Sequence, residues 1–181
     1  MAYILRAARP DDLPLLMHIE TQALALLEGH PVHAVFAGHA TPAGDFAAGR
    51  QRDCLWVACE GGRDTPVGYV LAGDLDGDFH ILQMDVSPAH GRRGVGRALL
   101  EHACARARTR GYRHAVLTTL SDVAWNAPFY ARTGFQVLAP GQWTAGLRAV
   151  MQHERSLGFP MDLRVAMWRD LQAGSYEAAS T

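Results

Sequence analysis

A glycine-spaced segment with adjacent arginines is the part of this sequence best suited to chemistry. It reads HGRRGVG over residues 90–96, after an apolar run from Phe79 to Val86 that predicts a buried strand. A helical pattern follows from Arg97 to Arg110, and Gly111 suits its C-cap. A strand, a glycine loop and a helix start together favour a phosphate ligand. Glycines let the backbone approach the ligand closely, and the free N–H groups of a helix start point at an anion.

Two common phosphate motifs do not fit this loop. Walker A ends in Gly-Lys-Ser/Thr, and the chain contains no lysine. The dinucleotide fingerprint needs a third glycine where this chain has Leu99. The loop instead resembles the acyl-CoA loop of the GNAT superfamily of N-acetyltransferases, whose pattern is Gln/Arg-x-x-Gly-x-Gly/Ala after a strand. Gly94 and Gly96 take its last two fixed positions, whereas Gly91 departs from the first, and the arginines beside it supply positive charge.

A second segment strengthens the resemblance. Residues 125–135 read WNAPFYARTGF and are similar to the second GNAT signature, a short helix followed by a strand. The residues that match the signature are Asn126, Phe129, Tyr130, Gly134 and Phe135. The residue pattern agrees, because Asn126 suits a helix start and Gly134 suits a C-cap. Two motifs in this order identify the chain as a member of the superfamily, over roughly residues 79–137.

The resemblance implies an α/β (α+β) GNAT acyl-CoA N-acyltransferase fold, with a mixed central sheet of about six to seven strands and flanking helices. Apolar runs predict strands at residues 3–8, 54–59, 66–72, 79–86, 113–120 and 163–171. Helical spacing predicts helices near residues 13–23, 41–51, 97–110 and 143–157. We expect a single domain over residues 1–173 and a frayed C-terminal tail over residues 174–181.

Composition narrows the class of protein. The chain has 181 residues and a formal net charge of −1, which argues against a nucleic-acid or membrane-surface partner. No apolar run is long enough to span a bilayer, and the N-terminus lacks the pattern of a signal peptide. The three cysteines have no metal-site spacing, so we expect reduced thiols and a cytoplasmic location. The histidines between residues 30 and 39 lack a nearby carboxylate or cysteine at zinc-site spacing, so we expect a polar loop and no metal.

The resemblance also implies acetyl-CoA as the acyl donor. In the family the central strand and the one after it diverge, and the pantetheine arm lies between them like a partial strand. Backbone groups of Met84 and Val86 would bind this arm, and the Met84 amide region would polarise the thioester carbonyl. The residues expected to contact the cofactor are Met84, Asp85, Val86, Gly91, Arg92, Arg93, Gly94, Val95, Gly96, Arg97, Ala98, Asn126 and Tyr130. Capping of its own helix explains Asn126 equally well.

The expected reaction is direct attack by a bound amine, in which Tyr130, at the family's tyrosine position, protonates the leaving thiolate. The general base is left open. His80 is the first choice, since imidazole titrates in the useful range and similar members carry a histidine there. Glu20 and Asp85 are alternatives. Strict alternation along the strand would place His80 and Asp85 on opposite faces.

The expected acceptor is a primary amine of a small molecule. Its pocket would be built from residues 20–46, the turn at residues 122–125 and the helix at residues 143–157. Protein or peptide amines remain alternative acceptors. A non-catalytic acyl-CoA sensor and a plain nucleotide-binding module are alternatives from other functional classes. A homodimer is possible, because GNAT proteins are often dimers.

Overall fold

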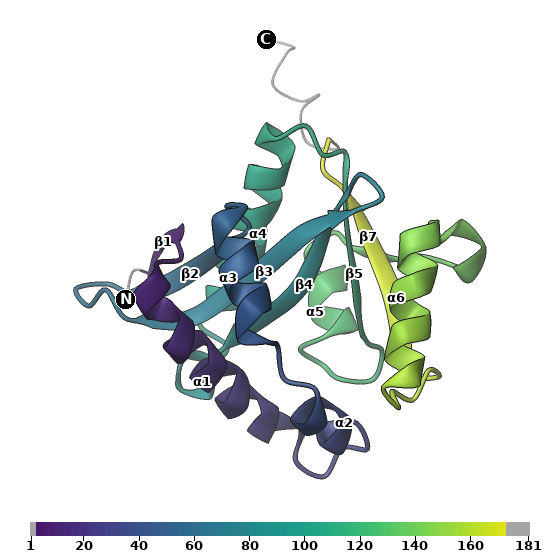
Figure 1. Ribbon diagram of the computed structural model, residues 1–181, viewed down its shortest axis with the longest axis horizontal. Helices are drawn as coiled ribbons and strands as arrows, with labels where there is room; N and C mark the ends of the chain where they lie inside the picture. Colours follow the sequence, from purple (N-terminus) through teal and green to yellow (C-terminus); the bar gives the residue numbers. More distant parts are fainter. Residues whose placement is uncertain (1–2, 173–181) are drawn as a thin grey trace.

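In the computed structural model, which describes residues 3–172, seven strands form one mixed sheet in the order β1-β2-β3-β4-β5-β7-β6 (Figure 1). The strands are β1 Tyr3–Ala7, β2 Leu55–Glu60, β3 Pro66–Leu75, β4 Asp78–Val86, β5 His114–Leu120, β6 Gln136–Val137 and β7 Arg164–Asp170. The α-helices are α1 Leu13–Leu24, α2 His33–Gly38, α3 Ala43–Gln51, α4 Val95–Thr109, α5 Ala127–Ala131 and α6 Ala145–Ser156. Short 3-10 turns are η1 Pro10–Asp12, η2 Ala25–Leu27, η3 Pro88–His90 and η4 Pro140–Gln142. The predicted fold class is confirmed.

The centre of the sheet opens between two neighbouring strands. β4 and β5 are parallel, as expected for strands joined through one helix, α4. They pair only at Phe79 with Ala115 and at His80 with Val116. Beyond these pairs the strands part, so their facing backbone groups have no strand partner there. We call residues 81–86 of β4 and residues 117–120 of β5 the β4–β5 fork.

Helices cover both faces of the sheet. In the view of Figure 1, α4 and α5 lie behind the sheet, and α1, α3 and α6 lie in front of it. The core behind the sheet joins Leu99 of α4 and Tyr130 of α5 to inward-facing strand residues such as Phe79. The front core joins Leu16 of α1 and Phe46 of α3 to the sheet. Each strand residue of the fork can therefore be assigned to one face by the core that it joins.

A bulge in β4 changes the facing of the residues that follow it. In the pairing with β3, Leu71 lies opposite Gln83, but the next residue of β3, Ala72, lies opposite Ile81. Leu82 is therefore the extra residue, and its side chain is half exposed. An extra residue shifts the two-residue alternation of the strand by one position.

The shift brings two titratable residues onto the same face. Phe79 before the bulge, and Met84 and Val86 after it, all pack on the core behind the sheet. His80 and Asp85 alternate with them and therefore both face the front. The prediction that these two residues lie on opposite faces was wrong, because a bulge leaves no signal in a simple alternation pattern.

Most predicted elements are present with shifted ends, but one helix was missed. α2 forms within residues 29–40, where a polar loop was expected. It is short and no side chain caps its start, so the usual start signals are absent. The predicted tail at residues 174–181 lies outside the described residues. No helix within residues 3–172 has the length and apolar character that crossing a membrane requires.

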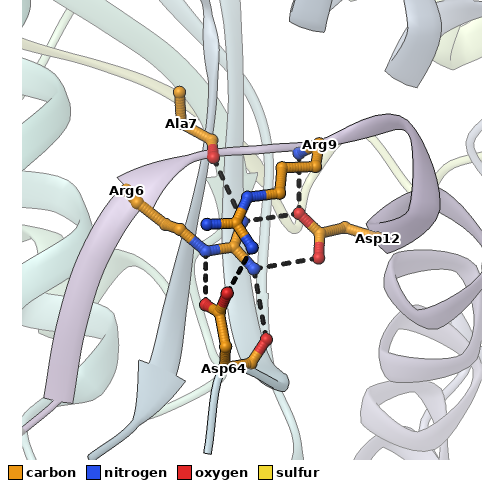
Figure 2. A network of polar contacts seen from close by, with 5 residues as sticks. All are labelled: Arg6, Ala7, Arg9, Asp12 and Asp64. Carbon is orange, nitrogen blue, oxygen red and sulfur yellow. Dashed lines mark hydrogen bonds and ion pairs between the residues drawn. The ribbon is translucent and has the colours of Figure 1, made fainter.

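A network of ion pairs fixes one corner of the sheet (Figure 2). Arg6 of β1 holds both carboxylate oxygens of Asp12, with Nη1–Oδ2 at 2.7 Å and Nη2–Oδ1 at 3.0 Å. Its Nε donates to Asp64 in the β2–β3 turn at 2.7 Å, and Arg9 also pairs with Asp64. Burial alone would raise the pKa of Asp12, but hydrogen bonds from Arg6 and from the Arg9 N–H more than offset it and lower that pKa. Each of these four charged side chains therefore has an opposite partner.

Candidate active site

The glycine loop between β4 and α4 has the backbone shape that the sequence predicted. Gly94 is the N-cap of α4, with φ of 81°, which favours glycine. Arg92 also has a positive φ, 57°, which is uncommon for a residue with a Cβ. Such strained residues cluster where a loop is held in shape for binding. A Cβ on Gly96 would lie within 3.9 Å of side chains of Val86, Phe129 and Met84. This glycine therefore lets the loop lie close to β4 and to α5.

The start of α4 is suited to an anion. A glycine N-cap has no side chain, so the first N–H groups of the helix are not capped, and the first intrahelical bond runs from the Ala98 N–H to the Gly94 oxygen at 2.9 Å. Val95 is buried and anchors the first turn. Arg92, Arg93 and Arg97 are exposed around it. This arrangement combines free backbone donors, the positive end of a helix and mobile cations at one site.

Tyr130 lies on α5, behind the sheet, and is 8% exposed. Its ring packs edge-on against Phe129 and Phe135, which holds it in place. Within the described residues, the hydrogen bonds of Tyr130 are made by its backbone, so the phenol hydroxyl is available to a ligand. Burial raises the pKa of this phenol, and the negative charge of Asp85 raises it further. Tyr130 is therefore neutral and carries a proton at physiological pH.

Asp85 lies on β4 within the fork and faces the front of the sheet. Its Oδ2 accepts hydrogen bonds from the Tyr69 hydroxyl and from the Gln83 amide, each at 2.8 Å. Both donors are neutral. Burial raises the pKa of Asp85 to about 6, and the charge of Glu20 contributes to the rise, although the two hydrogen bonds oppose it. A carboxylate that titrates near neutral pH is matched to the work of a general base.

Glu20, the third proposed base, accepts two hydrogen bonds from a single residue that precedes α3. Its Oε1 accepts the Thr41 N–H at 3.0 Å and the Thr41 hydroxyl at 2.8 Å. Glu20 therefore ties α1 to the start of the α3 segment. Its charge still acts on Asp85, because it helps to raise the pKa of that carboxyl. The geometry gives Glu20 the role of a tether and of an electrostatic neighbour.

His80 is buried at the base of the fork and is 6% exposed. Burial lowers the pKa of its imidazole to about 4, and Glu154 opposes this shift. The ring is neutral at physiological pH, and a base with so low a pKa takes up a proton weakly. Of the proposed bases on the front face, Asp85 is better matched to neutral pH than His80.

Sequence reasoning missed a polar cluster beside His80. Glu154 of α6 accepts from Arg164 Nε at 3.0 Å and from the Thr118 hydroxyl at 2.6 Å, and the Arg164 guanidinium lies 4.9 Å from the centre of the Phe159 ring. The side chains of Arg164 and Glu154 are 7% and 13% exposed. These residues are far apart in sequence, and only the fold brings them together. A helical pattern with one acid on its inward face was the only available signal.

Asn126 stands at the N-cap of α5, as predicted. Its backbone oxygen accepts the Tyr130 N–H at 3.0 Å, but its side chain makes no capping bond. The capping explanation therefore does not account for the asparagine side chain. Tyr69 and Gln83, which hold Asp85, were also missed, because their contacts depend on the bulge and on strand register. Within residues 3–172 no three histidine, cysteine or acidic side chains are grouped as a metal site.

Comparisons with known proteins agree with this fold. The sequence matches the Acetyltransferase (GNAT) family over residues 16–135. The ribosomal-protein-S18-alanine N-acetyltransferase from Escherichia coli is 18% identical, with a TM-score of 0.64 and coverage of 94% of both chains. The PaiA N-acetyltransferase from Thermoplasma acidophilum, solved in complex with coenzyme A, is 14% identical, with a TM-score of 0.69 and coverage of 94% of this chain and 99% of the other. Ard1 from Thermoplasma volcanium is 18% identical, with a TM-score of 0.66 and coverage of 94% and 98%.

The fold and the family match define an acyltransferase. The chain belongs to the GNAT acetyltransferase family, because the family match covers well over half of its length. The predicted family is confirmed. The solved structures are too distant in sequence to carry more than the fold.

Proposed function

We propose that this protein transfers the acetyl group of acetyl-CoA to the primary amine of a small molecule by direct attack. The observation that carries the proposal is the β4–β5 fork, which has a proton-bearing phenol behind it and a carboxyl with a pKa of about 6 in front of it. Acyl transfer to an amine needs one group to remove a proton from the nucleophile and another to protonate the thiolate. Tyr130 can supply the proton and Asp85 can remove one, and the two residues lie on opposite sides of the β4–β5 fork.

The acyl donor would enter from the side of the glycine loop. The free N–H groups of Val95, Gly96 and Arg97 would bind the pyrophosphate, with exposed arginines screening its charge. The pantetheine arm would then lie in the fork. It would pair with β4 at Met84 and Val86, on the edge of the strand that faces β5 and has no strand partner there. In that position the thioester lies near Tyr130, which donates its proton to the departing sulfur.

The acceptor would approach from the front face. Asp85, held by Tyr69 and Gln83, would take a proton from the ammonium group directly or through water. The amine then attacks the thioester carbonyl, the C–S bond breaks, and the thiolate takes the Tyr130 proton. The attacking nitrogen loses its second proton to water as the amide forms, and a proton from water returns Tyr130 to its neutral form. Holding donor and acceptor together supplies several kcal/mol of the required rate enhancement. No covalent enzyme intermediate is needed.

A panel assay tests this proposal. Thiol release from acetyl-CoA is measured with amines, amino acids and short peptides as acceptors, together with calorimetric binding of CoA and of ADP. We expect release that depends on one small amine, and tighter binding of CoA than of ADP because the pantetheine arm adds contacts. Thiol release only with peptides would indicate that the acceptor is a protein amine. Tight CoA binding with no release from any acceptor would support the sensor function instead.

A further inference from the structure

A cavity away from the fork remains unexplained by acyl transfer. It has a volume of about 600 Å³ and lies between α6, β7 and the chain that follows β6. Its apolar wall is formed by Val137, Leu138, Trp143, Met151, Met161 and Val165. The size falls within the range of small-molecule sites in proteins. The cavity lies at the β6 edge of the sheet, on the side of β7 away from β5.

The wall of the cavity is fixed in place. The Trp143 indole N–H donates to the Leu138 backbone oxygen at 2.9 Å, so the ring cannot turn freely into the space. The Trp143 backbone oxygen accepts a hydrogen bond from Arg148. Met151 is almost fully buried and closes the floor. A preformed apolar space of this kind binds a ligand without first paying a large ordering entropy.

All charged side chains that line the cavity are positive. They are Arg148, Arg155 and Arg164, and no aspartate or glutamate among residues 3–172 lines it. Arg164 is neutralised by Glu154, and Arg148 has a partial partner in a backbone oxygen. Arg155 stands in the last turn of α6, and no ion pair within residues 3–172 engages it. An apolar cavity with an unneutralised guanidinium at its rim has the chemistry of a site for an organic anion.

We propose that this cavity binds an amphipathic organic anion, with an apolar body against the Met151–Val165 wall and a carboxylate on Arg155. The guanidinium fork matches a carboxylate through two parallel N–H donors. A neutral ligand of the same shape would lose this contact, and a cation would be repelled by Arg155, the guanidinium without an acidic partner among residues 3–172. The cavity shares residues 143–157 with the predicted acceptor pocket, but it lies on the side of β7 away from β5 and the fork. Its occupant is therefore a second ligand of the protein.

Calorimetry with decanoate, decanol and decylamine tests the proposal on the full chain. We expect saturable decanoate binding with a dissociation constant below about 1 mM, and at least tenfold weaker binding of decanol and decylamine. Arg155→Gln is expected to weaken decanoate binding roughly tenfold, as the loss of one charge-assisted contact predicts. Ala139→Phe, an exposed position on the cavity rim, is expected to block binding by filling the entrance. Arg63→Gln, an exposed arginine in the β2–β3 turn, serves as the matched control and is expected to bind like wild type.

Specific results would overturn the proposal. They are the absence of saturable decanoate binding, equal binding of decylamine, or unchanged binding in both Arg155→Gln and Ala139→Phe when circular dichroism shows that the variants are folded. Sedimentation velocity on the same samples identifies a dimer; a dimer that buries the Val137 face and excludes decanoate would also overturn it. The measurement uses no acyl donor, so its failure leaves the proposed acetyl transfer untouched.

Discussion

Two aspartates in this molecule have partners at similar distances, yet their pKa values move in opposite directions. Asp12, in the corner near β1, is bound by the Arg6 guanidinium through both oxygens, and its pKa is lowered. Asp85, in the fork, is bound by the neutral Tyr69 and Gln83 side chains, and its pKa is raised to about 6. Both are desolvated by the fold. Asp85 is the more deeply buried of the two and lies near the negative charge of Glu20, whereas Asp12 has a cationic partner that outweighs its desolvation.

The contrast separates a structural site from a chemical one. A carboxylate with a cationic partner stays ionised over the whole physiological range and serves only to join elements. A buried carboxylate without a cationic partner can take up and release a proton near neutral pH, but its burial lowers the stability of the folded protein. The corner therefore contributes to folding, and the fork contributes to proton transfer. Substitutions at the two sites are expected to separate stability from activity.

Asp85→Asn is expected to have the largest effect. Removal of a general base lowers turnover by roughly 100-fold or more. The fold should persist, because an asparagine oxygen still accepts a hydrogen bond from Tyr69. Steady-state thiol release and thermal unfolding of the same preparation measure both quantities. Unchanged turnover in a variant that binds CoA normally would remove Asp85 from the mechanism.

Asp12→Asn is expected to give the reverse result. Breaking a buried pair destabilises a protein by several kcal/mol, and here we expect about 2 kcal/mol, because Arg6 retains Asp64 and some solvent contact. Turnover should stay within twofold of wild type, since no part of the fork is touched. Urea unfolding at pH 7 gives the change in free energy. A stable variant with impaired turnover would contradict the division between the two sites.

The pH dependence of stability should also differ between the sites. The lowered pKa of Asp12 means that its contribution is present above the ordinary pKa of 3.8 and is lost as pH falls through the folded value. The raised pKa of Asp85 means that its protonated form is favoured in the folded state. Ionising it therefore removes stability as pH rises from about 4 through about 6.

Urea unfolding from pH 3 to pH 8 tests these signs. Relative to wild type, Asp85→Asn should gain stability as pH rises from 4 to 7. Asp12→Asn should begin to approach wild type as pH falls below 4, because wild type then starts to lose its ion pair. Parallel curves for wild type and Asp85→Asn would show that the fold does not shift the pKa of the Asp85 carboxyl.

Glu20→Gln is expected to have the smallest effect. Glutamine can still accept the Thr41 hydrogen bonds, but the negative charge that helps to raise the pKa of Asp85 is gone. The acid limb of the rate–pH profile should therefore move to lower pH, by less than about one unit for a secondary charge effect. The assay needs an acceptor whose own amine does not titrate in that range. Turnover that falls greatly at every pH would instead make Glu20 the base.

The sequence predicted the parts of the site that depend on local geometry. The glycine loop requires backbone freedom at Gly94, and the short helix with Tyr130 has its own start and stop residues, so both are visible in a single stretch of chain. The mixed central sheet and the opening between β4 and β5 followed from the family resemblance.

The sequence did not reveal on which face of the sheet the proposed bases lie or how the fold shifts their pKa values. One extra residue at Leu82 reverses the alternation of β4 and moves Asp85 to the face of His80. The raised pKa of Asp85 depends on its burial in the fold and on the charge of Glu20, and neither can be read from the residues beside Asp85 in the sequence. His80 was preferred for the ordinary pKa of an imidazole, but its burial in the fold lowers that value to about 4.

The most direct test of the account compares Tyr130→Phe with wild type in thiol release and in CoA binding, with Tyr112→Phe as the matched control. Tyr112 is also partly buried behind the sheet but lies away from the fork. We predict that Tyr130→Phe binds CoA within twofold of wild type and loses at least roughly tenfold in turnover, the minimum expected for removal of a general acid. Tyr112→Phe should retain wild-type turnover. Full turnover in Tyr130→Phe would contradict the claim that the fork is an acid–base site for acyl transfer.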